Sequence, residues 1–200
     1  MRIILTRHGE TEENMEGRFM GHLPGTLSKK GIEQAKKLAL RLKDEKIDKI
    51  FSSDLARAAD TAKEIAKYHK NIPIEFTQEI RERFLGEIQG VRKVDLGLNP
   101  NELVAGKIES KEGELQEALF NRAKKFIDKI INEFDEETVL IVAHNGINLA
   151  LTTNILKKTF EDYMKATPQL NCAVSIFEID RDKNHKIHLF NCIKHLEEIK

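Results

Sequence analysis

The sequence has no tryptophan, only two cysteines and no long apolar run. Its wholly apolar stretches are short, such as VLIVA at residues 139–143, whereas a membrane-spanning helix needs roughly 20 residues. The opening MRIILTRHG meets a charge too early to serve as a signal peptide. Cys172 and Cys192 lack a zinc-ligand spacing, and without an export signal we expect them to be reduced thiols. These absences predict a cytoplasmic protein.

An excess of charge of one sign is also missing. Lysine plus arginine and aspartate plus glutamate both total 33, so the net charge is zero. A neutral chain has no long-range field that would draw it to nucleic acid or to an anionic membrane. We therefore expect neither as a partner. A site for an anion has to come from the local placement of basic side chains.

What the sequence does have is a regular alternation of apolar strands and amphipathic helices. Strands are expected at residues 2–6, 47–53, 72–76, 138–144, 173–179 and 186–192. Helices are expected at residues 28–45, 54–69, 115–134 and 145–156, the second of them capped by Asp54 or a preceding serine. This alternation is typical of an α/β fold. It predicts a three-layer αβα sandwich with a mostly parallel central sheet.

Two hundred residues fit one domain with a proper core. Residues 84–112 interrupt the alternation with turn-forming residues: Gly86, Gly90, Gly97, Pro100 and Gly106. We interpret this segment as a roof over the sheet, inserted within a single domain of residues 1–200. The outer edge of the last strand is a candidate for pairing with a second copy in a homodimer.

Arginine and histidine gather where the predicted strands end. The first strand runs into Arg7, His8 and Gly9, the second leads to Arg57 in the first turn of a helix, and the strand at 138–144 ends in His144. Ligands of such folds bind beyond the carboxyl ends of the strands. Helix N-termini and guanidinium groups both favour an anion there, and a glycine lets the backbone approach it closely. The pattern predicts a phosphate site.

Each of these residues alone has an ordinary explanation. Arg57 could be a solvated helix residue, His144 a satisfied core histidine, and Glu82 a surface carboxylate paired with Arg81 or Arg83. Two histidines and Glu82 would also suit a transition metal. Two arginines in the same pocket would repel a divalent cation, however, so we expect neither a metal nor another cofactor.

Several stretches, in this order, resemble the signatures of a known family. They are TRHGETEEN from Thr6, GHLPGTLSKKGIEQAKKLALRL from Gly21, FSSDLARAADTA from Phe51, IRERFLGEIQG from Ile80 and VLIVAHNGINLAL from Val139. They are similar to segments of the histidine phosphatase superfamily, in its phosphoglycerate mutase-like branch. The resemblance covers most of the chain, apart from the roof and the last strands.

The resemblance implies a set of catalytic roles. His8 would be the nucleophile that becomes phosphohistidine, and Glu82 would give a proton to the leaving oxygen. Four side chains would bind the phosphoryl oxygens: Arg7, Asn14, Arg57 and a protonated His144. For attack, His8 needs one unprotonated ring nitrogen, so its other nitrogen should donate to a fixed acceptor, expected in the backbone.

One residue departs from the family pattern. The family usually has glycine after its last histidine, where this chain has Asn145, whose side chain is expected near the phosphate and could narrow the pocket. Substrate contacts are expected from Arg83 and Lys93, whereas His22 could be either a substrate contact or a solvated loop histidine.

The same pocket could serve two reactions. Arg83 and Lys93 favour a phosphoglycerate mutase, whereas the short roof and the sequence NRAKK at residues 121–125, which lacks the paired arginines of the mutases, favour a phosphatase. We predict a metal-independent phosphomonoester hydrolase that acts on a small phosphometabolite. A phosphoglycerate mutase is the alternative, and a weakly catalytic protein that binds a phosphorylated ligand is a third.

Overall fold

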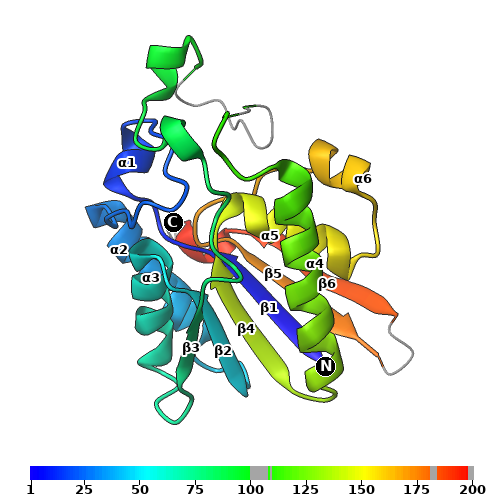
Figure 1. Ribbon diagram of the computed structural model, residues 1–200. Helices are drawn as coiled ribbons and strands as arrows, with labels where there is room; N and C mark the ends of the chain where they lie inside the picture. Colours follow the sequence, from blue (N-terminus) through cyan, green and yellow to red (C-terminus); the bar gives the residue numbers. More distant parts are fainter. Residues whose placement is uncertain (100–107, 109, 181–183, 198–200) are drawn as a thin grey trace.

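The computed structural model describes residues 1–99, 108, 110–180 and 184–197, in which six strands form one sheet (Figure 1). In chain order they are β1 (Arg2–Arg7), β2 (Lys49–Ser53), β3 (Ile74–Thr77), β4 (Thr138–Ala143), β5 (Val174–Ile179) and β6 (His185–Cys192). The spatial order is β3-β2-β4-β1-β5-β6. The first four pair in parallel, β5 runs antiparallel to β1, and β6 runs antiparallel to β5.

Helices cover both faces of this sheet (Figure 1). On one face lie α2 (Lys29–Leu42) and α3 (Ala56–Ala66), and on the other lie α4 (Gln116–Glu133), α5 (Asn145–Ile155) and α6 (Phe160–Lys165). A short α1 (Glu12–Met15) follows β1. The three-layer αβα sandwich predicted from the sequence is confirmed.

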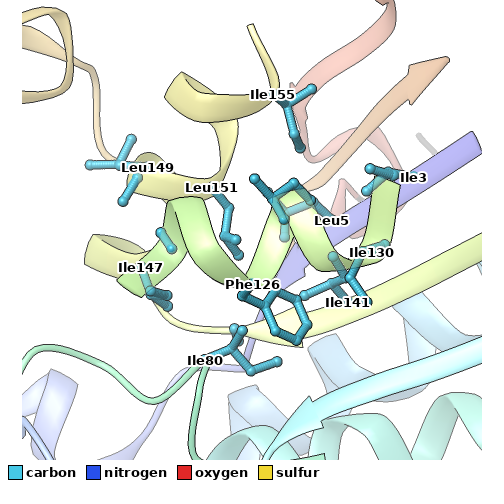
Figure 2. Close-up of a cluster of buried hydrophobic side chains, with 14 of the residues drawn as sticks. Ile3, Leu5, Ile80, Phe126, Ile130, Ile141, Ile147, Leu149, Leu151 and Ile155 are labelled. Carbon is cyan, nitrogen blue, oxygen red and sulfur yellow. The ribbon is translucent and has the colours of Figure 1, made fainter. Parts of the chain in front are cut away.

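The position of β4 in the core explains why its sequence is an unbroken apolar run. All six of its residues are buried, because β4 lies between β1 and β2 and has helices on both faces. Figure 2 shows the cluster under α4 and α5, in which Phe126 of α4 lies among aliphatic side chains such as Ile141 of β4 and Ile147 of α5. Ile80, which follows β3, belongs to the same cluster.

Two local expectations were wrong or incomplete. Leu55, not Asp54 or a serine, is the N-cap of α3, and no side chain caps this helix. Asp54 instead accepts hydrogen bonds from Arg81, and Ser53 Oγ accepts one from the Leu55 N–H. The helix α6 was not expected at all.

The roof contains two short 3₁₀ helices in its described part, η1 (Gly86–Ile88) and η2 (Lys93–Leu96). Residues 100–107 and 109 of the expected roof lie outside the described residues. Both cysteines are free, with Cys172 buried. In the described part of the chain, no helix is long and apolar enough to span a membrane.

The sheet brings the predicted functional residues to one edge. Arg7 at the end of β1 is in register with Ala143 at the end of β4, so His8 and His144 follow neighbouring strands at the same level. Ser52 in β2 pairs with Val142 of β4, which places the start of α3 beside them. The site therefore lies beyond the carboxyl ends of β1, β4 and β2.

Candidate active site

A cavity of about 160 Å³ opens at this edge of the sheet. Its lining includes Arg7, His8, Asn14, Arg57 and Glu82. We call the other polar lining residues the outer wall: Arg18, Arg83, Lys93, Gln116, Asn145 and Tyr163. We call Arg7, His8 and Arg57, together with His144 buried behind them, the floor of the site. The cavity is rich in cations, because five arginine or lysine side chains line it and Glu82 is its one acidic lining residue among those described.

His8 is held in one orientation by two contacts. Its Nδ1 lies 2.7 Å from the carbonyl oxygen of Gly9, and its Nε2 lies 3.3 Å from Nε of Arg57. An arginine nitrogen only donates, so Nε2 is the acceptor and Nδ1 carries the proton. Burial, and then the charge of Arg57, hold the pKa of His8 well below its usual 6.5. The ring therefore presents an unprotonated Nε2, with the backbone acceptor that the sequence predicted.

Gly9 is also needed for a packing contact that the sequence did not reveal. A Cβ at Gly9 would lie 2.5 Å from the carbonyl oxygen of Gly31, in the first turn of α2. In return, a Cβ at Gly31 would lie 1.9 Å from the carbonyl oxygen of Glu10. The close approach is thus between the β1–α1 connection and α2, and it needs glycine on both sides.

Arg57 is a buried cation with a dense set of acceptors. Its side chain donates to the carbonyl oxygens of Gly21, Leu23 and Pro24, which form the loop before α2. Only 2% of its surface is exposed. Burial lowers its pKa to about 10, so the guanidinium keeps its charge at neutral pH. Arg57 thus fixes both the His8 ring and the loop that lines the cavity.

Arg7 is braced from the far end of the chain. Its Nη1 donates to the carbonyl oxygen of Gln169, at 2.8 Å. The Gln169 N–H donates to Oδ1 of Asn145, and its side-chain oxygen accepts from Asn148, at 2.8 and 2.6 Å. Asn145 thus has two positions in the site. It lines the cavity, and its side-chain oxygen fixes Gln169, whose carbonyl accepts from Arg7.

His144 is fully buried behind the cavity rather than on its wall. Its ring centroid lies 5.2 Å from that of His8, and its Nε2 lies 2.8 Å from Ser53 Oγ. Burial, and then Arg57, hold the pKa of His144 well below 6.5. In the ligand-free protein, burial therefore favours the neutral ring, and the protonated His144 that the resemblance implied for the phosphate complex stays a prediction. The positive charge of the floor comes from Arg7 and Arg57.

Two buried polar atoms of the floor lack a partner. Within the described residues, neither Arg7 Nε nor His144 Nδ1 has a hydrogen-bond partner. Buried polar groups are nearly always paired, so such exceptions mark places where a ligand or water completes the structure.

Glu82 points into the cavity and docks on the start of α5. Its carboxylate accepts from the N–H groups of Gly146, Ile147 and Arg83, at 3.0, 3.2 and 3.0 Å. The positive end of the α5 dipole favours a carboxylate at this position. The alternative of a surface carboxylate paired with Arg81 does not hold, because Arg81 binds Asp54.

The remaining predicted residues divide into two groups. Asn14, Arg83 and Lys93 line the cavity as expected. Asn14 uses its oxygen in the capping box of α1, which leaves its amide N–H₂ to donate to a ligand. His22 does not line this cavity in the described structure. Its Nε2 instead lies 2.8 Å from the backbone carbonyl of Glu82, behind the cavity wall.

Sequence reasoning missed two polar side chains of the outer wall, Gln116 and Tyr163. With its amide oriented to satisfy its neighbours, Gln116 donates to Tyr163 Oη, and its oxygen accepts from Arg83. Tyr163 comes from α6. The signal for that helix was present, because Thr159 and Asp162 form a capping box, the S/T-x-x-D/E pattern.

A metal centre was the alternative use of these residues. Across the described part of the chain, His, Cys, Asp and Glu side chains do not gather in groups of three or more that could hold a metal ion.

Comparisons with known proteins agree with this geometry. The chain is 29% identical to a metal-independent phosphoserine phosphatase of Arabidopsis thaliana, over 98% of this chain and 84% of the relative. It is 34% identical to phosphoserine phosphatase 1 of Hydrogenobacter thermophilus, over 72% and 71%.

Solved structures agree as well. Bacillus stearothermophilus YhfR superposes with a TM-score of 0.86 at 26% identity, over 98% of this chain and 99% of that one. A putative alpha-ribazole-5'-P phosphatase from Escherichia coli superposes with a TM-score of 0.84 at 27% identity, over 96% of each chain. The family model of the histidine phosphatase superfamily (branch 1) matches residues 3–192. With its fold, its cationic cavity and this match over nearly its whole length, the chain belongs to the histidine phosphatase superfamily.

Proposed function

We propose that this protein is a metal-independent phosphatase that hydrolyses small phosphate monoesters through a phosphohistidine at His8. The observation that carries the proposal is the state of His8, whose Nδ1 proton is engaged by a carbonyl and whose Nε2 faces a cationic cavity. Relatives named as phosphoserine phosphatases, as a broad-specificity phosphatase and as a putative alpha-ribazole-5'-P phosphatase support the same reaction.

In the first step the floor binds the phosphoryl group. Arg7 and Arg57 neutralise its oxygens, and Arg7 Nε gains the partner that it lacks. As the Arg57 Nε–H turns from His8 Nε2 to a phosphoryl oxygen, the freed lone pair of Nε2 attacks phosphorus in line with the departing ester oxygen. Glu82 takes up a proton when the ester binds, because the negative charge of the phosphoryl group opposes a carboxylate beside it. As the phosphorus–oxygen bond breaks, Glu82 gives that proton to the departing oxygen and the alcohol leaves.

In the second step water replaces the alcohol. Glu82, now a carboxylate, takes a proton from water, and the oxygen of that water attacks the phosphohistidine. The nitrogen–phosphorus bond breaks, inorganic phosphate leaves, and His8 returns to its neutral form. Since Arg7 and Arg57 provide the positive charge, the cycle needs no metal.

The proposal is tested by measuring phosphate release, in the presence of a chelator, from p-nitrophenyl phosphate, phosphoserine, alpha-ribazole phosphate and a set of sugar phosphates. We expect turnover of at least one alkyl ester, together with an acid-labile phosphoprotein during turnover. His8→Ala should abolish both. Absence of turnover with every ester, or full turnover by His8→Ala, would contradict the proposal. Tight phosphate binding without turnover would identify a binding protein.

The mutase alternative has a specific observation in its favour, because Arg83 and Lys93 both line the outer wall. A mutase would interconvert 2- and 3-phosphoglycerate after addition of a bisphosphate primer and release little phosphate. The two readouts can be collected from the same reaction mixtures.

The proposal includes a cytoplasmic location, one domain with a roof, and a homodimer that pairs through β6. This strand is the last in the sheet order, and Ile187 and Phe190 on it are exposed. Light scattering that gives the mass of a single chain at every concentration would contradict the dimer.

A further inference from the structure

Arg122 of α4 donates hydrogen bonds to the backbone of residues 78–84. We call these residues, which include Glu82, the Glu82 segment. Its Nη1 donates to the carbonyl oxygens of Glu79 and Arg81, at 2.8 and 2.9 Å. Its Nη2 donates to the carbonyl oxygen of Glu82 itself, at 3.4 Å. One side chain thus fixes three carbonyls across four consecutive residues.

The other donors of Arg122 are committed to Glu114. Nε donates to one carboxylate oxygen at 2.9 Å and Nη2 to the other at 2.7 Å, a bidentate ion pair. Together these bonds use all five N–H groups of the guanidinium. Glu114 also accepts from the Phe84 N–H, and its own N–H donates to the Phe84 carbonyl, so the pair reaches the end of the Glu82 segment as well.

The same segment is anchored on two further sides. Ile80 is fully buried in the cluster under α4 (Figure 2), and the His22 ring contacts the Glu82 carbonyl. The carboxylate end of Glu82 rests on Gly146 and Ile147. Arg122 itself does not line the cavity in the described structure and reaches it only through the backbone of residue 82.

We propose that Arg122, oriented by Glu114, is a positioning residue that sets where Glu82 delivers its proton. This inference rests on the proposed function, in which Glu82 protonates the leaving oxygen. Lysine cannot replace Arg122, because its ammonium has three donors and no planar fork. Without Arg122 three backbone carbonyls lose a charged donor, and the Glu82 segment loses its fixed register against α4.

The test compares two leaving groups. The alkoxide of an alkyl phosphate needs a proton to leave, whereas the nitrophenolate of p-nitrophenyl phosphate leaves without one. General acid catalysis contributes roughly 10²- to 10⁴-fold to such a reaction. For Arg122→Ala we expect kcat/KM with the fastest alkyl ester of the panel to fall about 10- to 100-fold. This constant reports the steps up to phosphohistidine formation and leaves out the water step, in which Glu82 acts as a base for both esters. With p-nitrophenyl phosphate we expect a fall of less than about threefold, because the floor remains intact.

Several variants separate this role from a merely structural one. Arg122→Lys should show the same selective loss, and Glu114→Gln a smaller one, which keeps the test usable if Arg122→Ala does not fold. Lys124→Ala, which removes an exposed ion pair from the same helix, is the matched control and should leave both rates unchanged. Inhibition by inorganic phosphate should be the same in all of them, since it reports on the floor.

The outcomes distinguish this inference from the proposed function. Glu82→Gln should show the selective loss of alkyl ester hydrolysis, and Arg122→Ala should add little to it in the double variant. If Glu82→Gln shows no selectivity, the acid role itself fails. If Glu82→Gln is selective but folded Arg122 variants lose both substrates equally, or neither, only the positioning role of Arg122 is overturned.

Discussion

The floor of the site consists of side chains at the ends of buried strands and at the start of α3, whereas the described roof consists of turns and two short 3₁₀ helices with exposed side chains. His8, Arg57 and His144 expose 3%, 2% and 0% of their surface. Val94 and Leu96 in the roof expose 46% and 45%. A phosphoryl group is the same in every substrate, so its site can be rigid. The alcohol differs between substrates, so the wall that meets it can vary without disturbing the chemistry.

The largest effect is expected from a conservative change in the floor, Arg57→Lys. Lysine cannot reach the loop carbonyls and orient His8 at the same time, so kcat/KM should fall by about 10²- to 10³-fold for every ester. Steady-state kinetics with several substrates measure this loss. Arg41→Lys, an exposed ion-pair residue on α2, is the control and should have no effect. A loss confined to some substrates would contradict the division between floor and roof.

The floor should also make the protein sensitive to acid. His8 and His144 have pKa values well below 6.5 in the folded state, because burial disfavours their charged forms. Below pH 6.5 the unfolded chain therefore binds more protons, and the free energy of unfolding falls as the pH falls. The slope should reach about 1.4 kcal/mol per pH unit for each histidine. Urea unfolding at several pH values tests this, and an unchanged slope in His144→Gln would refute the assignment.

In the roof, Lys93→Ala should produce a smaller loss that depends on the substrate. Lys93 lines the outer wall and is not part of the floor. An ester with a carboxylate in its alcohol should therefore show a KM about tenfold higher, as expected for the loss of one bond to a charged group. For p-nitrophenyl phosphate KM should change little. Arg92→Ala, an exposed neighbour paired with Asp95, is the matched control. Equal losses for both esters would place Lys93 with the floor instead.

The smallest effect is expected where floor and outer wall meet, at Asn145. Asn145→Gly removes the acceptor for the Gln169 N–H and so loosens the brace on Arg7. One neutral hydrogen bond contributes about 1 kcal/mol, so the inhibition constant of inorganic phosphate should rise about fivefold. An unchanged constant would mean that the side chain acts on the alcohol rather than through Arg7.

The same division explains what the sequence could predict. Arg7, His8, Arg57 and His144 stand at strand ends and helix starts, which local apolar patterns mark clearly, and the family resemblance added Glu82 and Asn14. The sheet order then places them together. The charge states of these residues were harder to predict than their positions. The neutral ring of His144 depends on burial and on nearby cations, which only the packed structure brings together.

What the sequence could not predict are contacts between distant parts of the chain. Arg122 reaches backbone carbonyls about 40 residues earlier, and the Gln169 carbonyl braces a residue 162 positions away. Every residue has a backbone carbonyl, so the residue type does not predict which carbonyl accepts a bond from a distant side chain. The contact of His22 could not be predicted for the same reason, since its partner is the backbone carbonyl of Glu82.

The antiparallel direction of β5 has a consequence for how much of the chain the site needs. Because β5 starts at the carboxyl edge of β1, the Cys172 N–H reaches the carbonyl oxygens of Arg7 and His8, next to the Gln169 brace. Residues just before β5 therefore support a strand end that lies more than 160 positions earlier in the chain. A fragment that ended before Gln169 would contain both His8 and His144 and would still lack these supports of Arg7.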